Sequence, residues 1–223
     1  MDKNIKNWKK IYSRGLAGGL LRYPNENLVA LFTKYKSLIN LEGCCLDYGF
    51  GSANNSEFLV QYMASLHGVE IASSCLDIAR DRLAAYKKFD PSLFVVRQDL
   101  SGYENKFDLV VAWQVLCYND MQGLKDRVRM LQASLKPGGI LITTLTIQSD
   151  IKAKFASQVA PNTFVIDERI PHQEGCQIFA VKDKNEFLSI FEAFEVLDAG
   201  WFGRGSFCEE RTLSEYYLVA RKP

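Results

Sequence analysis

One segment, residues 45–56, constrains the fold of this chain more than any other stretch. It reads CLDYGFGSANNS, in which an apolar strand is followed by a carboxylate, two glycines one residue apart and polar residues suited to begin a helix. Because glycine has no Cβ, Gly49 and Gly51 can take backbone angles closed to other residues and let a ligand approach the main chain. Glu70 follows at the end of the next strand-like run, and the combination predicts a nucleoside-binding α/β site.

The rest of the chain also favours an α/β architecture. Strand-like and helix-like segments alternate from Cys44 to Thr146, a pattern typical of βαβ units and a parallel sheet. Beyond Thr146 the pattern is less regular. We expect helices at 27–38, 54–66, 73–87, 121–135, 150–158 and 183–194, and a final pair of strands at 194–202 and 213–220.

The composition predicts one compact enzyme domain without a nucleic-acid or membrane partner. A chain of 223 residues with 48% hydrophobic content can bury a substantial core. Its net charge of +1, without a long basic run, lacks the electrostatic footprint of a protein that grips a nucleic-acid backbone. No apolar run approaches the roughly 18 residues of a membrane span, and the first residues lack the apolar segment of a secretory signal. The six cysteines form no C-x-x-C pair, so we expect reduced thiols in a cytoplasmic protein.

A glycine loop followed by an acidic residue about 20 positions later is also a feature of dinucleotide-binding folds. In the G-x-G-x-x-G pattern of those folds, the third glycine would fall on Asn54. A pyrophosphate at the helix N-terminus also disfavours an adjacent carboxylate such as Asp47. A cationic ligand without phosphate therefore fits the loop better, and a nucleotide-dependent oxidoreductase or epimerase is the alternative.

Residues 46–51, LDYGFG, resemble the first motif of the class I S-adenosylmethionine-dependent methyltransferases. Segments similar to later parts of that family follow in the family's order at 68–83, 95–100, 107–116 and 135–145. The resemblance covers residues 41–146 and implies a single Rossmann-like domain. Its expected sheet is mostly parallel and seven-stranded, with helices on both faces and an antiparallel C-terminal edge strand. A core at 41–223, an acceptor-side insertion at about 148–182 and an N-terminal helical arm or lid at 1–40 follow from this comparison.

The resemblance also implies a cofactor, S-adenosyl-L-methionine, which leaves as S-adenosyl-L-homocysteine. Glu70 would accept hydrogen bonds from the ribose hydroxyls, and Asp99 with Leu100 would lie beside the adenine. Arg22 is a candidate partner of the methionine carboxylate. Taken singly, each acidic residue can also be a cap or a solvated charge. The full set of expected cofactor residues is Asp47, Gly49, Gly51, Glu70, Ile71, Asp99, Leu100, Trp113 and Arg22.

The residues expected around the methyl acceptor are inferred from topology alone. His172 lies in the irregular region after the fifth expected strand and is the leading candidate for a catalytic base, because an imidazole can take up a proton near neutral pH. The alternative is an exposed loop histidine. The expected substrate-contacting residues are Tyr118, Gln114, Tyr12, Trp201 and Arg204, and Phe207 belongs to the same expected wall.

Together these observations predict methyl transfer to a small molecule, with a hydroxyl of a sugar or secondary-metabolite intermediate favoured over a nitrogen or carbon acceptor. The fourth strand ends in Ala112-Trp113-Gln114-Val115, without the Asn/Asp-Pro-Pro motif associated with amino methylation of nucleic-acid bases or glutamine. No metal is expected. A non-catalytic module that binds S-adenosylmethionine is a further alternative, and the chain is expected to be a monomer or a homodimer.

Overall fold

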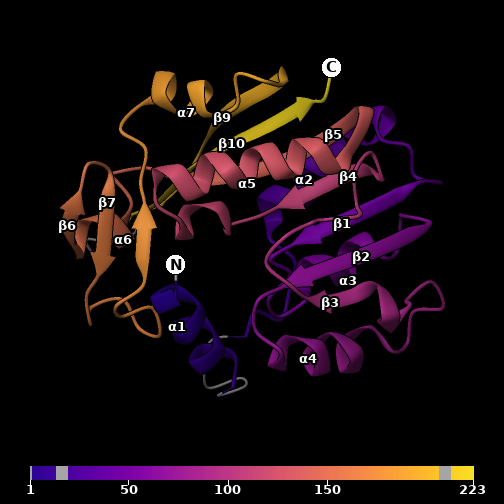
Figure 1. Ribbon diagram of the computed structural model, residues 1–223, viewed down its shortest axis with the longest axis horizontal. Helices are drawn as coiled ribbons and strands as arrows, with labels where there is room; N and C mark the ends of the chain where they lie inside the picture. The colour runs from indigo at the N-terminus through magenta and orange to yellow at the C-terminus, as the bar shows by residue number, and fades with distance from the viewer. Residues whose placement is uncertain (1, 14–19, 206–211) are drawn as a thin grey trace.

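The computed structural model describes residues 2–13, 20–205 and 212–223, which form an α/β domain around a large twisted sheet (Figure 1). The sheet has seven strands in the order β3-β2-β1-β4-β5-β10-β9. Phe207 and Cys208 lie outside the described residues. The strands are β1 (Cys44–Tyr48), β2 (Ser65–Glu70), β3 (Phe94–Val96), β4 (Phe107–Ala112), β5 (Leu135–Thr146), β9 (Glu195–Gly205) and β10 (Thr212–Arg221).

The strand directions confirm the predicted fold class. Strands β1 to β5 pair in parallel, and β10 pairs antiparallel with both β5 and β9. The C-terminal hairpin therefore supplies the antiparallel edge, with β10 on its inner side and β9 on its outer side. The strand order reverses between β1 and β4, and a crevice for a ligand forms at such a point, beyond the carboxyl ends of the strands.

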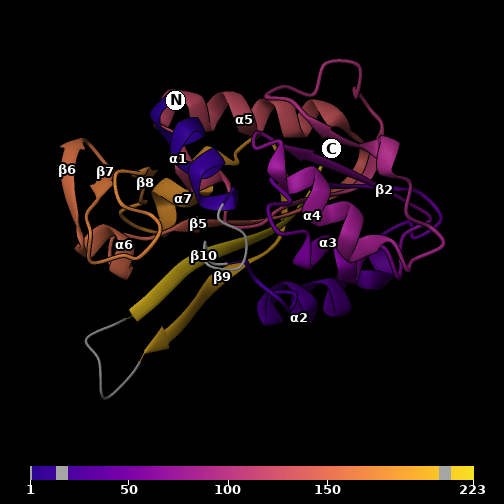
Figure 2. The ribbon, with the colours of Figure 1, turned by 90° about the horizontal axis from the view of Figure 1, so that it is seen from below.

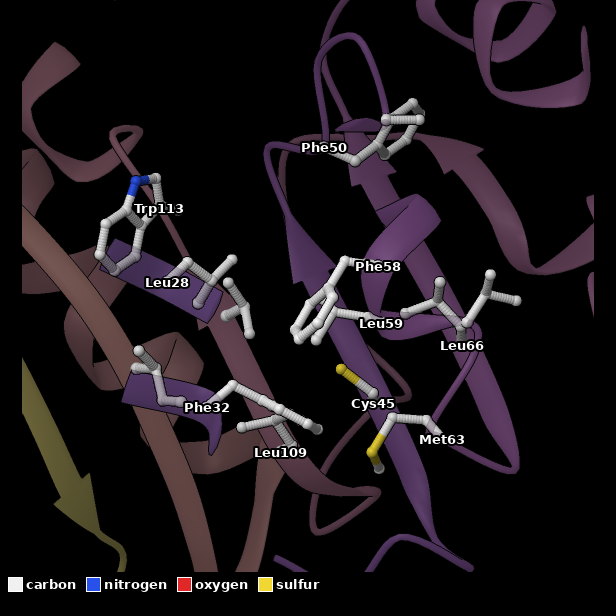
Figure 3. Packing of buried hydrophobic residues seen from close by; sticks show 14 of the residues in the cluster. Leu28, Phe32, Cys45, Phe50, Phe58, Leu59, Met63, Leu66, Leu109 and Trp113 are labelled. Atoms are coloured by element: carbon white, nitrogen blue, oxygen red, sulfur yellow. The ribbon is translucent and has the colours of Figure 1, made fainter. Parts of the chain in front are cut away.

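Helices cover both faces of the sheet (Figure 2). On one face, α2 (Glu26–Tyr35), α3 (Asn54–Leu59) and α4 (Ser74–Leu83) share one apolar cluster with the sheet. Leu28 and Phe32 of α2 lie among Cys45, Leu59 and Leu109 (Figure 3). On the other face, α5 (Met121–Ser134) and α7 (Lys184–Ile190) pack through a second cluster. Three short 3-10 helices connect these elements: η2 (Lys36–Leu38), η3 (Pro91–Leu93) and η4 (Leu116–Tyr118).

Several predicted helices were too long. The helix expected at 54–66 ends at Leu59, because the buried strand β2 begins at Ser65 and a turn must separate the two. The helix expected at 73–87 ends at Leu83. Its fully buried residues, such as Cys75 and Ala79, extend to Leu83, and residues 84, 85 and 87 are exposed while Tyr86 packs half-buried against the same cluster. The helix expected at 183–194 likewise ends early, at Ile190, whereas those expected at 27–38 and 121–135 lie close to their predicted bounds.

The region 148–182 differs most from the prediction. The helix expected at 150–158 is the four-residue α6 (Ile151–Lys154), and a three-stranded antiparallel sheet follows it. The Pro161-Asn162 turn, with Asn162 at φ 56°, joins β6 and β7 into an antiparallel hairpin. The strands are β6 (Ala156–Ala160), β7 (Thr163–Ile166) and β8 (Gln177–Phe179).

Helix α1 (Asp2–Tyr12) lies against this small sheet and extends toward α4 (Figure 1). The side-chain amide of Asn4 donates to the carbonyls of Tyr118 and Gln177, and its oxygen accepts from the Gln177 N–H. Three hydrogen bonds from one buried side chain fix the start of the helix next to the carboxyl ends of the large sheet. None of the described helices is long and apolar enough to cross a membrane.

Candidate functional site

The glycine loop after β1 has the geometry that its sequence predicts. Gly49 and Gly51 have φ values of 75° and 50°, in the left-handed region. A Cβ on Gly49 would lie 2.4 Å from Cγ2 of Val115, and one on Gly51 would lie 2.3 Å from the hydroxyl of Tyr12. Both positions therefore favour glycine, because side chains rarely adopt this conformation and because an added Cβ would crowd Val115 or Tyr12. Ala53 follows at φ 55°, which a small side chain tolerates at some cost.

Glu70 ends β2 and faces this loop. Its Oε2 accepts from the N–H of Gly51 at 3.1 Å, and its Oε1 accepts from the N–H groups of Ile71 at 2.6 Å and Ala72 at 3.4 Å. Burial raises the pKa of Glu70, and these backbone hydrogen bonds oppose the rise. The main chain thus holds the carboxylate in place, and Oε2, which accepts one backbone hydrogen bond, keeps a lone pair for a ligand.

A cavity of about 750 Å³ opens between the glycine loop, α1, the loop between β7 and β8, and the β9–β10 hairpin. We call its wall around Gly49, Gly51, Glu70, Ile71 and Arg97 the glycine-loop side. Trp113, which is 5% exposed, also lines the cavity. This volume lies within the range of small-molecule sites, about 300–1,000 Å³.

Four of the expected cofactor residues do not line this cavity. Asp47 lies behind the loop, where it accepts a 2.6 Å hydrogen bond from the Ser56 hydroxyl, and burial raises its pKa to about 7. Leu100 is 4% exposed and packs in the core. Arg22 is exposed, with its guanidinium 5.9 Å from the ring centre of Tyr23.

Asp99 is also outside the large cavity, at an adjoining shallow depression. Its carboxylate accepts from the Arg97 guanidinium and from the Ser101 N–H, and these bonds lower its pKa to about 2. Arg97 and Gln98 line the large cavity in its place. The third parallel strand therefore reaches the site, but through the two residues that precede the predicted carboxylate.

The opposite wall, which we call the ion-pair side, comprises Gln114, Tyr118, Lys152, His172 and Glu215. The hydroxyl of Tyr118 donates to Oε1 of Gln173 at 2.9 Å. His172 is exposed in its loop, at φ 66°. The three predicted residues Gln114, Tyr118 and His172 thus meet at one cavity.

Helix α1 covers both sides. The ring of Trp8 stacks on that of Tyr12, with centroids 5.6 Å apart, and meets the ring of Tyr118 edge-on at 4.8 Å. Tyr12 in turn approaches Gly51 on the glycine-loop side. The predicted contact residue Tyr12 therefore lies where the two sides join.

Strand alternation explains the remaining two expected contacts. Phe202 and Arg204 line the cavity from β9, whereas Trp201 is 66% exposed and does not. Successive strand residues point to opposite faces, so Phe202 and Trp201 cannot both face the cavity. Of the two residues expected here, Arg204 therefore lines the cavity and Trp201 lies on the other face of the strand.

The sequence interpretation missed the charged pair Lys152 and Glu215. Their side chains are 10% and 11% exposed, and Nζ lies 3.7 Å from Oε1. Glu215 Oε2 also accepts from Nε2 of Gln114 at 3.0 Å. A carboxylate inside an otherwise apolar C-terminal strand was the available signal, because Asp and Glu are depleted in strands.

Electrostatics in this part of the site follow from burial. Burial by itself lowers the pKa of Lys152. The electrostatic interactions with Tyr118 and Glu215 outweigh this effect and raise the pKa, so the ammonium stays charged. Burial raises the pKa of Glu215, against the opposing effects of Lys152 and Gln114.

No cluster of three or more His, Cys, Asp or Glu side chains suited to a metal ion occurs among residues 2–13, 20–205 and 212–223.

A family model described as a methyltransferase domain matches residues 19–194. Among solved structures, a SAM-dependent methyltransferase from Methanosarcina mazei is 18% identical, with a TM-score of 0.65 over 85% of this chain and 96% of that one. The N-methyltransferase NodS from Bradyrhizobium japonicum WM9, in complex with S-adenosyl-l-homocysteine, is also 18% identical, with a TM-score of 0.64 over 97% and 99% of the two chains. A SAM-dependent methyltransferase from Anabaena variabilis is 13% identical, with a TM-score of 0.67 over 98% and 95%. No curated protein sequence matches this chain.

Proposed function

This chain belongs to the class I S-adenosylmethionine-dependent methyltransferases, and from that premise we propose that it methylates a hydroxyl of a small biosynthetic intermediate, such as a sugar or a secondary metabolite. The proposal makes the glycine-loop side the cofactor site and the ion-pair side the acceptor site.

The observation that carries the cofactor assignment is the carboxylate of Glu70. Three backbone N–H groups hold it at the cavity wall, one of them from Gly51 in the loop itself. A fixed acceptor beside two glycines, which have no side chains, fits a ribose diol placed against the main chain. The residues present therefore fit the nucleoside of S-adenosylmethionine.

When bound, this cofactor supplies an already activated methyl group, so the protein mainly positions the acceptor and excludes water. The cavity walls suit a small acceptor, because α1, the loop between β7 and β8 and the C-terminal hairpin enclose it on several sides. We include α1 as a lid over both ligands, since Tyr12 approaches the glycine loop and Trp8 packs on Tyr118.

A hydroxyl acceptor needs a group that takes its proton. His172 is the candidate that the sequence suggests, and it lines the cavity from an exposed loop. We further propose a cytoplasmic enzyme, a monomer or homodimer, that acts without a nucleic-acid or membrane partner. The net charge of +1 and the cysteines without C-x-x-C spacing support this.

Calorimetric titration of S-adenosylmethionine, S-adenosylhomocysteine and NAD tests the cofactor assignment. We expect both sulfur compounds to bind and NAD not to bind. Glu70→Ala should weaken binding about 10-fold or more, because a hydrogen bond to a charged group contributes roughly 1.5–3 kcal/mol. Asp81→Ala, at an exposed position on α4, is the matched control. A folded wild type that binds neither sulfur compound would refute the assignment, and binding without product from any acceptor would favour a non-catalytic module.

A further inference from the structure

Lys152 and Glu215 form a buried ion pair that no feature of the cofactor site requires. Lys152 comes from α6, after β5, and Glu215 comes from β10, opposite Thr146 of β5. Both side chains line the cavity and are about nine-tenths buried. Burial of two charges is costly unless their remaining hydrogen-bonding capacity is satisfied. Here that capacity is only partly used.

The ammonium of Lys152 makes no side-chain hydrogen bond to the part of the chain that the structure describes. Its contact with Oε1 of Glu215 is 3.7 Å long, beyond hydrogen-bond range. Oε2 of Glu215 accepts from Gln114, whereas Oε1 has only the ion pair. A donor and an acceptor whose contact with each other is longer than a hydrogen bond thus lie side by side at the cavity wall. A hydroxyl matches such a pair, because it accepts one hydrogen bond while it donates another.

The pair also lies close to the glycine loop. Gln114, which binds Glu215, has φ 55°, and its N–H donates to the hydroxyl of Thr144 at 3.0 Å. The next residue, Val115, contacts the loop so closely that a Cβ on Gly49 would lie 2.4 Å from its Cγ2. Glu215 is therefore connected through two adjacent residues to the main chain that would carry the cofactor.

We propose that Lys152 and Glu215 hold the acceptor hydroxyl and that Glu215 takes its proton. This inference rests on the proposed function and specifies the base. The O–H bond breaks and the proton moves to Oε1 of Glu215, while the oxygen forms a bond to the methyl carbon. The bond from that carbon to the sulfonium sulfur breaks, and its electron pair stays on sulfur as a neutral thioether. Glu215 then releases the proton to solvent.

The surroundings of Glu215 suit this role. The charged or titratable groups around it are Lys152 and Asp150 from the α6 region and Cys117 and Tyr118 from η4. Both oxygens of Asp150 already accept backbone hydrogen bonds, from Ser214 and Lys152. Lys152 is thus the cation beside Glu215, placed to stabilise negative charge on the acceptor oxygen. His172 is exposed, where water competes for its contacts.

Binding of two probes to the protein loaded with S-adenosylhomocysteine tests the recognition step. Phenol has a hydroxyl, and anisole is its methyl ether without a donor. We expect the wild type to bind phenol about 10-fold more tightly than anisole, and Glu215→Gln and Lys152→Met each to abolish the preference. Glu195→Gln on β9 and the exposed Lys154→Met on α6 are matched controls that should keep it. No preference in the wild type, or an unchanged preference in Glu215→Gln, would overturn the proposal.

Affinity for S-adenosylhomocysteine separates the possible failures. If the wild type does not bind it, the proposed function fails as well. If a single variant loses it through misfolding, the double variant Lys152→Met/Glu215→Gln, which leaves no unpaired charge, is used in its place. If a variant keeps its affinity for S-adenosylhomocysteine and its preference for phenol is unchanged, the proposed role of the ion pair is refuted and the proposed function is not.

Formation of anisole from phenol tests the proton transfer. We expect Glu215→Gln to lower kcat by about 10²-fold or more, the usual contribution of a general base, with a smaller effect on KM. A larger loss of kcat in His172→Gln than in Glu215→Gln would assign the base to His172 and overturn the proposal. A wild type that binds phenol preferentially but forms no anisole would overturn the proton-transfer step.

Discussion

The glycine-loop side of the cavity is built from main-chain groups and from residues close together in sequence, whereas the ion-pair side is built from side chains that are distant in sequence. Gly49, Gly51 and Glu70 lie within 22 residues of one another, and backbone N–H groups fix the carboxylate. Lys152 and Glu215 are separated by more than sixty residues. The first arrangement can serve any chain with this fold, while the second can change from one chain to the next without altering the sheet.

The largest expected effect concerns the ion-pair side. Lys152→Met leaves the carboxylate of Glu215 buried without its cation, and breaking a buried pair in this way costs about 3–5 kcal/mol. Urea unfolding at pH 7 should show a loss of this size. Lys154→Met, at an exposed position of the same helix, should change little.

The double variant Lys152→Met/Glu215→Gln sharpens this test. It should recover most of the loss, because it removes both charges from the interior. If Lys152→Met alone unfolds at the same urea concentration as the wild type, the pair is not buried in the way described.

The next effect concerns Asp47, the acidic residue of the glycine-loop motif, which does not line the cavity. Burial raises the pKa of Asp47 from 3.8 to about 7, so the folded state favours the protonated form. The resulting stability is present below pH 4, the unfolded value, and is lost as pH rises toward 7. Asp47→Asn removes this dependence. At about 1.4 kcal/mol per pKa unit, we expect the variant to gain up to about 4 kcal/mol on the wild type at pH 8.

Unfolding of both proteins at pH 4, 6 and 8 measures this difference. It should grow with pH between the first and the last value. A difference that does not depend on pH would contradict the raised pKa. Affinity for S-adenosylmethionine should be unchanged in Asp47→Asn, because the carboxylate lies behind the loop and binds Ser56.

The same contrast explains how far the sequence could predict the site. Glycine spacing and strand-end position are local patterns, so they identified the loop, Glu70 and the fold class. They did not tell which strand-end carboxylate faces the cavity, because Asp47 hydrogen-bonds to Ser56 and Asp99 to Arg97. The ion-pair side depends on how β10 and α6 come together, and that is tertiary packing which no local pattern encodes.

The small sheet after β5 was missed for a related reason. Segments such as β8 are three residues long, too short for a periodicity to distinguish strand from loop. Hydrogen bonding among β6, β7 and β8, and the contact of β8 with Asn4 of α1, decide the conformation of these segments. The helix predicted at 150–158 begins close to its predicted start, at Ile151 with Asp150 as its cap, but pairing of β6 with β7 ends it early.

A third, smaller effect tests whether the two sides communicate through α1. Gly51→Ala places a Cβ 2.3 Å from the Tyr12 hydroxyl and keeps a left-handed φ of 50°. We expect S-adenosylmethionine to bind about 10–100-fold more weakly, because the loop or Tyr12 must shift. Gly102→Ala is a matched control, since its φ is 81° and its Cβ would meet nothing within 4 Å.

Addition of Tyr12→Ala to the Gly51→Ala variant separates strain from crowding. Relief of the clash should restore part of the affinity, whereas strain in the loop would remain. If Tyr12→Ala restores nothing, α1 does not press on the loop, and the two sides are independent.

The smallest expected effect concerns β9, where strand alternation assigns adjacent residues to opposite faces. Trp201 is 66% exposed, and Phe202 stacks on Tyr217 with ring centroids 4.6 Å apart and lines the cavity. Trp201→Ala should change stability by no more than about 0.5 kcal/mol and leave ligand binding unchanged. Phe202→Ala should weaken binding of phenol to the protein loaded with S-adenosylhomocysteine, because it removes part of the wall. An effect of Trp201→Ala on phenol binding as large as that of Phe202→Ala would mean that the opposite face of the hairpin also reaches the acceptor, and the acceptor side would then have to be redrawn around both faces.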